Sequence, residues 1–517
     1  MLKILLIDIG YPREELNEPL GIEALAGALL ARFEEDVRIE LAYLKLAHPT
    51  VGVLLGSFRP DIVGISCKIG SFETLRFVQD EILKMDPVPV VILGDSLPTM
   101  AYSDVLSRYE DVICVIGEGE EAITAIVEQS LALGPTASDV FRERLVEGAV
   151  PNLAINCQGT VVCTIRSAID CRNFYVKPFR PYVKSILDNH GVIRIEGSRG
   201  CPWSQCSFCI IPWKYGQSLW RPFPVQKVLS EIIEVSQAGT GIVYFTDEDF
   251  IGPDRQRMFY LCNEILELKR NKVIDASLKF YASTSTRSVI GSYDELENTE
   301  LLTTMRTAGF LGFFLGVESG NPNQLARYNK GVTVDDNMWA LDLLSRCDLD
   351  VDAGFIMFDP EMTLHDLRDN LDFLERSGLL SHYSRFGKRL RTVPNTSLFK
   401  YYEDGDWITS GVNMDSVEVE VVFQSEDIAL IYDTYSRWEE RSISMAYDLQ
   451  SRIRSDLNDS QRIDGLKLEL AILRRHDYEL LRACCSEAEK DSRDLGKRLR
   501  KLFLDMTRRL DNRVGAQ

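Results

Sequence analysis

Residues 192–209 read VIRIEGSRGCPWSQCSFC, and this stretch decides how the rest of the chain is interpreted. It opens with a predicted strand, Val192–Glu196, after which Gly200 permits a tight turn. Three cysteines then follow within nine residues: Cys201, Cys206 and Cys209. Because thiolates are soft ligands, three of them in one compact loop suit a metal that prefers sulfur.

The number of thiols indicates which metal group the loop suits. Structural zinc sites are closed by four ligands, but no fourth Cys or His lies close by in the sequence, and His190 is the nearest. Three thiolates instead suit a [4Fe–4S] cluster that keeps one iron open for an exogenous ligand. Two alternatives stay open: a zinc site completed by a distant Cys or His, and buried cysteines that cluster by chance.

The composition bounds the class of protein. The chain has 517 residues, 78 acidic and 58 basic, with a formal net charge of −20. At about 150 residues per domain, this length suggests roughly three domains, and 45% hydrophobic residues can bury a sizeable core. The acidic balance argues against nucleic acid or an anionic membrane surface as the main partner. Twelve cysteines are too few for a disulfide scaffold.

No targeting or membrane-spanning segment is expected. Met1–Ile9 is apolar but short and contains Lys3 and Asp8, so it is interpreted as a strand and not as a signal peptide. No run of about 18 apolar residues occurs. These features predict a cytoplasmic protein, in which clustered cysteines more often bind metal than form disulfides.

Residues 1–135 alternate strand and helix signals. This alternation predicts parallel crossovers and a doubly wound, Rossmann- or flavodoxin-like domain, whose ligands bind at the carboxyl ends of the strands. Residues 136–190 are predicted to be a connector of short strands and extended stretches. The expected strands of the first domain are Leu2–Ile9, Val37–Leu44, Asp61–Ser66, Val88–Leu93 and Val112–Ile116.

Residues 191–400 carry a second alternating series, which predicts a full or partial (β/α) barrel with polar residues at the strand ends. Residues 401–517 are predicted to be a mostly helical, highly charged C-terminal domain. The expected barrel strands are Val192–Glu196, Ile242–Thr246, Leu278–Ser283, Gly312–Val317 and Val351–Phe358.

The three-cysteine loop after a first barrel strand resembles the radical S-adenosylmethionine (SAM) superfamily. The segments Arg199–Trp203 and Cys206–Cys209 resemble the corresponding segments of the subgroup that has an amino-terminal cobalamin-binding domain. One departure is that four residues, not the usual three, separate the first two cysteines. Further matching segments spread the resemblance over about residues 1–400: Pro19–Ile22, Pro60–Ser66, Gly117–Glu120, Asp247–Phe250, Gly316–Gly320, Lys330-Gly331 and Gly354–Met357.

The resemblance implies an α/β enzyme with a [4Fe–4S] cluster, SAM and cobalamin as cofactors. It implies reductive cleavage of SAM to a 5′-deoxyadenosyl radical, hydrogen abstraction from an unactivated carbon, and methyl transfer from methylcobalamin, in natural-product biosynthesis. The implied partners are a small-molecule or peptide substrate and an external one-electron reductant, without nucleic acid or membrane. Two alternatives stay open: a rearrangement, ring contraction or cyclisation without methyl transfer, and a non-catalytic metal-cluster scaffold.

Residue chemistry at the strand ends and, for Glu318, the resemblance suggest which residues contact two of the cofactors. Cys201, Cys206 and Cys209 are expected to hold the cluster. Ordinary polarity at strand ends is the alternative interpretation for the proposed SAM contacts, and core packing for the phenylalanine among them. These expected SAM-binding residues are Phe208, Asp247, Ser283, Ser285, Arg287 and Glu318.

The first domain lacks the Asp-x-His-x-x-Gly loop that supplies a histidine to cobalt in many cobalamin domains, and His48 is its one histidine. The subgroup commonly lacks this histidine, so cobalamin is still expected. A domain that binds nothing is the alternative. The expected cobalamin-binding residues are Tyr11, Ser66, Gly94, Ser96, Thr99, Gly117, Glu118 and Gly119.

Overall fold

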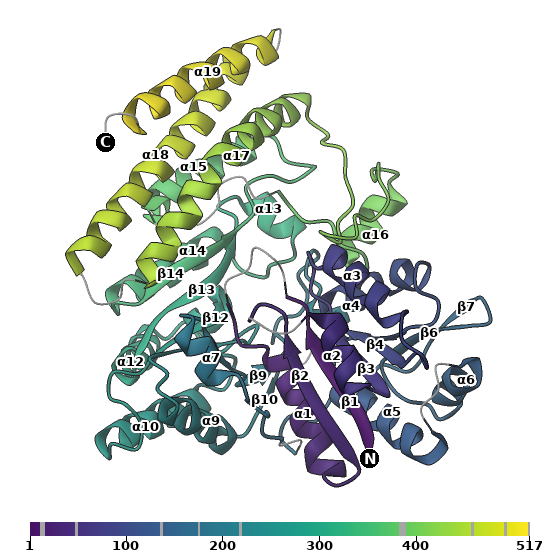
Figure 1. Ribbon diagram of the computed structural model, residues 1–517. Helices are drawn as coiled ribbons and strands as arrows, with labels where there is room; N and C mark the ends of the chain where they lie inside the picture. Colours follow the sequence, from purple (N-terminus) through teal and green to yellow (C-terminus); the bar gives the residue numbers. More distant parts are fainter. Residues whose placement is uncertain are drawn as a thin grey trace. The chain divides into compact units, whose positions relative to one another are not determined.

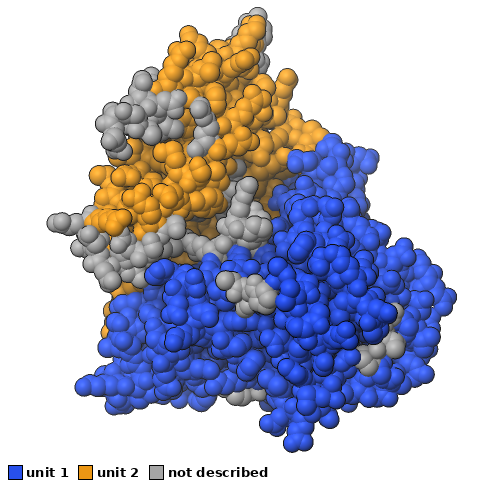
Figure 2. All heavy atoms as spheres, in the orientation of Figure 1, with its two compact units in different colours: residues 1–252, 256–280, 392–420 blue, residues 253–255, 281–391, 421–517 orange. Residues whose placement is uncertain are grey.

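The computed structural model describes residues 1–10, 16–46, 50–134, 138–173, 176–216, 220–381, 389–455, 460–490 and 494–514. The chain forms two compact units, which Figure 2 shows in different colours. Unit 1 comprises residues 1–252, 256–280 and 392–420. Unit 2 comprises residues 253–255, 281–391 and 421–517.

A seven-stranded sheet with the order β2-β1-β3-β4-β5-β6-β7 organises the first part of unit 1 (Figure 1). The pairings from β2 to β5 are parallel, whereas β6 and β7 are added antiparallel. The strands are β1 (Leu2–Asp8), β2 (Val37–Tyr43), β3 (Ile62–Ser66), β4 (Val90–Gly94), β5 (Ile113–Val115), β6 (Leu153–Cys157) and β7 (Thr160–Cys163).

Both faces of this sheet are buried, as continuous apolar strands require. Alternate residues of β1 enter opposite cores: Ile4 and Leu6 pack with α1 and α5, and Leu5 and Ile7 pack with α2, α3 and α4. The prediction of a doubly wound α/β domain is confirmed. The helices are α1 (Leu20–Phe33), α2 (Val51–Phe58), α3 (Phe72–Ile82), α4 (Ser96–Leu106) and α5 (Glu120–Leu133).

The sheet continues beyond residue 135, where the sequence predicts a connector. Leu153 and Ile155 of β6 are fully buried, and β6 pairs with β5, so this strand completes the core. Helix α6 (Asp139–Glu147) adds Phe141 and Leu145 to the same core, and α7 (Val183–Asp188) follows. The short strands expected in the connector are therefore part of the first sheet.

A second sheet of five strands has the order β14-β13-β12-β11-β8. The pairs β8–β11 and β13–β14 are parallel. All five expected strands of the second series form, while their curvature into a barrel stays a prediction. The strands are β8 (Ile193–Ile195), β11 (Ile242–Phe245), β12 (Lys279–Ser285), β13 (Phe310–Glu318) and β14 (Asp350–Phe355).

Helices alternate with these strands, and short elements complete the chain. A two-stranded ribbon of β9 (Ser198–Arg199) and β10 (Arg221–Pro222) frames the cysteine loop in sequence. The remaining elements are α8 (Ile211–Lys214), α9 (Val225–Gln237), α10 (Arg255–Arg270), α11 (Thr286–Ile290), α12 (Glu295–Ala308), α13 (Pro322–Arg327), α14 (Val334–Arg346), α15 (Leu364–Arg376), the 3₁₀ turn Leu379–Ser381 and α16 (Ser397–Asp404).

The C-terminal part of unit 2 is helical, as the sequence predicts. Helices α17 (Glu426–Ser455), α18 (Ser460–Lys490) and α19 (Leu495–Val514) pack on one another. Residues 401–420, which the sequence assigns to this helical domain, belong instead to unit 1, where Met414 and Val417 join the core of the first sheet. Within the described part of the chain, none of the helices has both the length and the apolar character that a bilayer span requires.

A buried carboxyl group joins α17 to α18. Asp477 is 2% exposed and accepts a hydrogen bond from Trp438 Nε1 at 2.6 Å. Burial raises the pKa of Asp477 to about 7, although Trp438, Arg474 and Ser442 lower it in part. The folded chain therefore holds a proton on this residue at pH values where the unfolded chain has released it.

We expect Asp477 to make stability fall as pH rises. An aspartate in the unfolded chain titrates near pH 4, so between about pH 5 and 7 folding takes up a proton, and the free energy of unfolding drops by roughly 2 kcal/mol through this residue. Asp477→Asn keeps an acceptor for Trp438. In urea unfolding at pH 5, 6 and 7, it should remove the fall in unfolding free energy with pH that Asp477 causes. The exposed Asp433→Asn on α17 serves as the control and should keep the wild-type slope. Equal slopes for all three proteins would contradict the assignment.

Candidate functional site

The cysteine loop follows β9 and leads into α8. Gly200 has φ +83°, so the turn into the loop uses a conformation that favours glycine. Ser204 Oγ donates to Cys201 O at 2.5 Å, and Cys209 N donates to Cys206 O at 3.1 Å. These bonds fold the loop back on itself and leave its three cysteines partly exposed.

The donor chemistry of the loop fits an iron–sulfur cluster. Within the described residues, no group of three Cys, His, Asp or Glu side chains is arranged to hold a single metal ion. Three thiolates that each bind a different iron of a cluster do not have to converge on one point. The partial exposure of these thiols also separates them from Cys67 and Cys262, which are fully buried and whose thiol pKa values burial raises.

Glu248, at the carboxyl end of β11, ties the two ends of the loop together. Its Oε2 accepts from Gly200 N at 3.1 Å, and its Oε1 accepts from Lys214 Nζ at 2.9 Å and from Tyr215 OH at 2.7 Å. Burial acts to raise the pKa of Glu248, but Lys214 and these hydrogen bonds outweigh it and hold the pKa below its ordinary value. The carboxylate is therefore charged throughout the neutral range.

Asp247 and Phe208, two of the expected SAM contacts, lie at this loop. Asp247 accepts from Gly197 N at 2.9 Å and from Ser198 Oγ at 2.5 Å, and so holds the chain between β8 and β9. Burial raises the pKa of Asp247 to about 7. Phe208 is half-buried within the loop itself. Both stay predicted SAM contacts.

The other expected SAM contacts lie at strand ends in unit 2. Glu318 has φ +67° at an irregularity in the pairing of β13 with β14, and its carboxylate lies 3.2 Å from Lys330 Nζ. A strained non-glycine conformation of this kind is typical of functional sites. Ser285 caps α11 by accepting from Ser288 N, Arg287 donates to Gly331 O, and Ser283 lies on β12.

A buried polar network supports the strand end that carries Glu318. Asn337 Nδ2 donates to Val317 O at 3.1 Å and to Ser319 O at 3.2 Å. Asn370 Oδ1 accepts from Gly320 N at 2.8 Å and from Ser319 Oγ at 2.9 Å. Such a connected set of hydrogen bonds fixes the backbone on both sides of Glu318.

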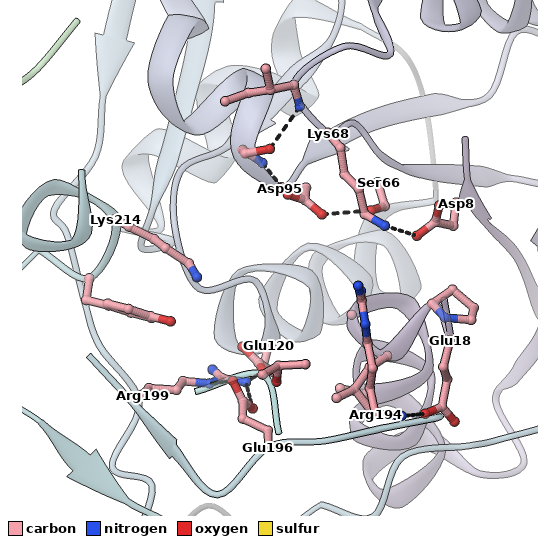
Figure 3. A pocket seen from close by; sticks show the side chains of 18 residues that line it. Asp8, Glu18, Ser66, Lys68, Asp95, Glu120, Arg194, Glu196, Arg199 and Lys214 are labelled. Atoms are coloured by element: carbon pink, nitrogen blue, oxygen red, sulfur yellow. Dashed lines mark hydrogen bonds and ion pairs between the residues drawn. The ribbon is translucent and has the colours of Figure 1, made fainter. Parts of the chain in front are cut away.

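A cavity of about 600 Å³ lies at the carboxyl ends of the first sheet, within the size range of cofactor sites. Ser66 and Ser96, two expected cobalamin contacts, line it together with Asp95. Ser66 Oγ donates to Asp95 Oδ2 at 3.1 Å, and Lys68 Nζ lies 3.6 Å from Asp8 Oδ2 (Figure 3).

Other expected cobalamin contacts have clear structural partners. Thr99 is buried, and its Oγ1 accepts from Gly117 N at 3.0 Å. Glu118 forms ion pairs with Arg199 at 2.9 Å and Arg221 at 3.1 Å. Gly94 ends β4 beside open space, Gly119 begins α5, and Tyr11 lies outside the described residues. All these residues stay predicted contacts.

Arg194, Glu196 and Lys214, which the sequence did not single out, form part of the other wall of the cavity, and Tyr215, which the sequence suggested for the lining of a substrate channel, joins them. Arg194 and Glu196 come from the β8 region, and Figure 3 shows the side chain of Arg194 extending into the cavity. Lys214 and Tyr215, which follow the cysteine loop, line the cavity as well. No local pattern places these residues at the cavity, because only the packing of β8 and α8 against the first sheet brings them there.

We expect Glu248→Ala to loosen the cysteine loop. The substitution removes the acceptor of the Gly200 N–H, and the loss of a hydrogen bond to a charged group costs about 1.5–3 kcal/mol. Amide hydrogen exchange in a peptide spanning residues 198–216 should therefore be about 10-fold faster or more at Gly200. The control, Glu267→Ala, removes an exposed ion pair with Arg270 on α10. Unchanged amide hydrogen exchange in Glu248→Ala would contradict the role of Glu248 in holding the two ends of the cysteine loop.

Comparison with known proteins agrees with this architecture. The model of the radical SAM superfamily matches residues 195–374, which include the cysteine loop and Glu318. The 4'-phospho-dehydrooxetanocin synthase of Priestia megaterium is 28% identical over 389 residues, covering 72% of this chain and 50% of the relative. The chain thus spans about half the length of the first curated relatives that it matches.

Two solved structures share the fold. The cobalamin-dependent SAM radical enzyme OxsB, with aqua-cobalamin and SAM bound, gives a TM-score of 0.79 at 21% identity and covers 93% of this chain and 72% of its own. The radical SAM methyltransferase TsrM of Kitasatospora setae, with cobalamin and a [4Fe–4S] cluster, gives 0.60 at 17% identity, covering 80% and 77%. Residues 195–374 therefore match the radical SAM superfamily, and the chain shares the fold of these two cobalamin-dependent enzymes.

Proposed function

We propose that the chain is a cobalamin-dependent radical SAM enzyme that transfers a methyl group to an unactivated carbon of a small-molecule or peptide substrate. One observation carries this proposal. The three-cysteine loop and the cavity of about 600 Å³ are built within the same unit, and the loop continues directly into Lys214 and Tyr215, which line the cavity. An iron–sulfur cluster and a large cofactor would thus be neighbours along one short stretch of chain.

The cofactors would be held by distinct sets of residues. Cys201, Cys206 and Cys209 would bind three irons of a [4Fe–4S] cluster. The cavity at the ends of β3 and β4, with Ser66 and Ser96 in its wall, would take cobalamin. SAM would contact Phe208, Asp247, Ser283, Ser285, Arg287 and Glu318.

Together these cofactors supply the electron transfer, the 5′-deoxyadenosyl radical and the methyl group. The protein's own residues bind, orient and exclude water. Glu248 holds the loop ends, and Asp247 holds the turn before the loop. The ion pair with Lys330 and the network around Ser319 fix Glu318. An external one-electron reductant is required, and we place the reaction in the cytoplasm and in natural-product biosynthesis.

A second candidate is a rearrangement, ring contraction or cyclisation without methyl transfer. It is favoured by the relative that matches 72% of this chain, whose name describes a synthase and not a methyltransferase. Both candidates use the same cofactors and residues. They differ in what happens to SAM.

Cofactor loading tests the proposal directly. After anaerobic reconstitution with iron, sulfide and hydroxocobalamin and gel filtration, we expect close to one cobalt per chain and a cluster absorption in the visible spectrum. Cys206→Ala should lose the cluster because it removes one of three ligands, and should retain cobalt. Cys163→Ala, which changes an exposed cysteine outside the loop, should retain both. A wild-type chain that retains iron but no cobalt would overturn the cobalamin assignment.

The products of SAM separate the two candidate functions. Methyl transfer should consume two SAM per turnover and release S-adenosylhomocysteine and 5′-deoxyadenosine in equal amounts. The rearrangement should release 5′-deoxyadenosine without S-adenosylhomocysteine. We would quantify both by mass spectrometry with a chemical one-electron reductant and candidate substrates. Substrate conversion without S-adenosylhomocysteine would overturn methyl transfer.

A further inference from the structure

Helix α8, which follows the cysteine loop, is held against the first domain by hydrogen bonds and by one close steric contact. Trp213 Nε1 donates to Thr99 O at 2.9 Å. Arg166 Nη2 donates to Trp213 O at 3.1 Å and to Lys214 O at 2.9 Å, and its guanidinium lies 5.3 Å from the centre of the Trp213 ring. We call Thr99, Gly117, Arg166, Trp213 and Lys214 the docking latch.

Gly117 is the tightest point of the docking latch. It has φ +83°, and its N–H donates to Thr99 Oγ1 at 3.0 Å. A Cβ atom at this position would lie 2.1 Å from Lys214 O and 2.6 Å from Arg166 Nη2. Since Cβ contacts below 3.0 Å are essentially never seen, any side chain here would force residue 117 and the carbonyl of Lys214 apart by about 1 Å.

The cysteine loop is also held from a second side. Ser207 O accepts from Leu398 N at 2.9 Å and from Ser397 Oγ at 3.1 Å. Asn395 Nδ2, in the same segment, donates to Met100 O of α4 at 3.0 Å. The segment 395–398 thus bridges the loop and α4, next to the Thr99 carbonyl that accepts from Trp213.

We propose that the docking latch is a positioning device that fixes the cysteine loop relative to the cavity at the strand ends of the first sheet. Lys214 connects the two, because its carbonyl belongs to the latch and its side chain lines the cavity. This inference rests on the proposed function, since the distance that the latch sets is the one between the cluster and cobalamin. A misplacement of about 1 Å can cost about 100-fold in rate, so this distance has to be fixed. Gly117 is therefore a positioning residue.

Gly117→Ala tests the latch, and the chain offers a matched control. Gly159, in the turn between β6 and β7, has the same φ of +83°, but a Cβ there would meet nothing within 4 Å. Gly159→Ala therefore carries the same backbone strain without the collision. Hydrogen exchange on the full chain as purified should be faster in residues 207–216 for Gly117→Ala and unchanged for Gly159→Ala. Equal exchange in both variants would overturn the latch, whether or not cofactors are bound.

A spectroscopic measurement reports the distance itself. In the reconstituted protein, the relaxation of the cob(II)alamin electron spin resonance signal should be faster when the cluster is reduced than when it is oxidised. Compared at matched cobalt and iron content, Gly117→Ala should lose part of this enhancement, and Gly159→Ala should keep it. Trp213→Phe is the second variant, for use if Gly117→Ala does not fold. It removes the donor to Thr99 O but keeps an aromatic ring, so it should lose a smaller part of the relaxation enhancement.

The outcomes separate the two proposals. Wild-type relaxation enhancement in both Gly117→Ala and Trp213→Phe would overturn the latch and leave the proposed function standing. Loss of cobalt from Gly117→Ala with unchanged exchange in residues 207–216 would show that Gly117 is a cofactor contact, and would also overturn the latch. A wild-type chain that loads neither cofactor would overturn the proposed function, and the exchange measurement would still decide the latch.

Discussion

The buried guanidinium of Arg199 is the interaction on which the rest of the site depends. Its nitrogens lie 2.9 Å from Glu118, 2.6 Å from Glu120 and 2.9 Å from Glu196. Removing a charge from water costs several kcal/mol unless it is paired and hydrogen-bonded, so this arginine is stable only where the carboxylates surround it. Burial acts to raise the pKa of Glu120, but Arg199 outweighs it, and the pKa stays below its ordinary value. The start of the cysteine loop is thereby bound to the turn that begins α5.

The same constraint recurs where other distant segments meet in unit 1. Arg180 is 2% exposed and pairs with Glu18, before α1, and with Glu231 of α9, at 2.6 Å for the latter. Glu18 also accepts from the backbone N–H of Arg194 at 2.7 Å. Because each buried charge needs its partner, these segments have one stable arrangement. The wall of the cavity that includes Glu18 and Arg194 is consequently fixed before any ligand enters.

The loop cysteines are chemically distinct from other cysteines of the chain because of where they lie. Cys67 and Cys114 are fully buried in the first sheet, and burial raises their thiol pKa values, which makes them poor ligands and nucleophiles. Cys201, Cys206 and Cys209 are partly exposed, in a loop whose backbone is fixed by Glu248 on one side and by α8 on the other. The three loop thiols are therefore accessible and carried on a backbone that hydrogen bonds hold in place, which supports their proposed role as cluster ligands.

The sequence by itself determined the features that depend on local patterns. Apolar runs such as that of β1, and their alternation with helices, predict both series of strands, and the spacing of the three cysteines indicates their chemistry. It did not show that β6 and β7 extend the first sheet, because the sequence of a short strand does not specify the strand with which it pairs.

Only the tertiary structure decided which side chains meet. Glu118 and Arg199 are 81 positions apart in the sequence, and Thr99 and Trp213 are 114 apart. Small residues such as Thr99 and Gly117, which the sequence suggested as cofactor contacts, touch α8 in the folded chain. A local pattern reports the propensity and burial of its own segment, whereas ion pairs and steric contacts depend on where distant segments are placed by the packing of the core.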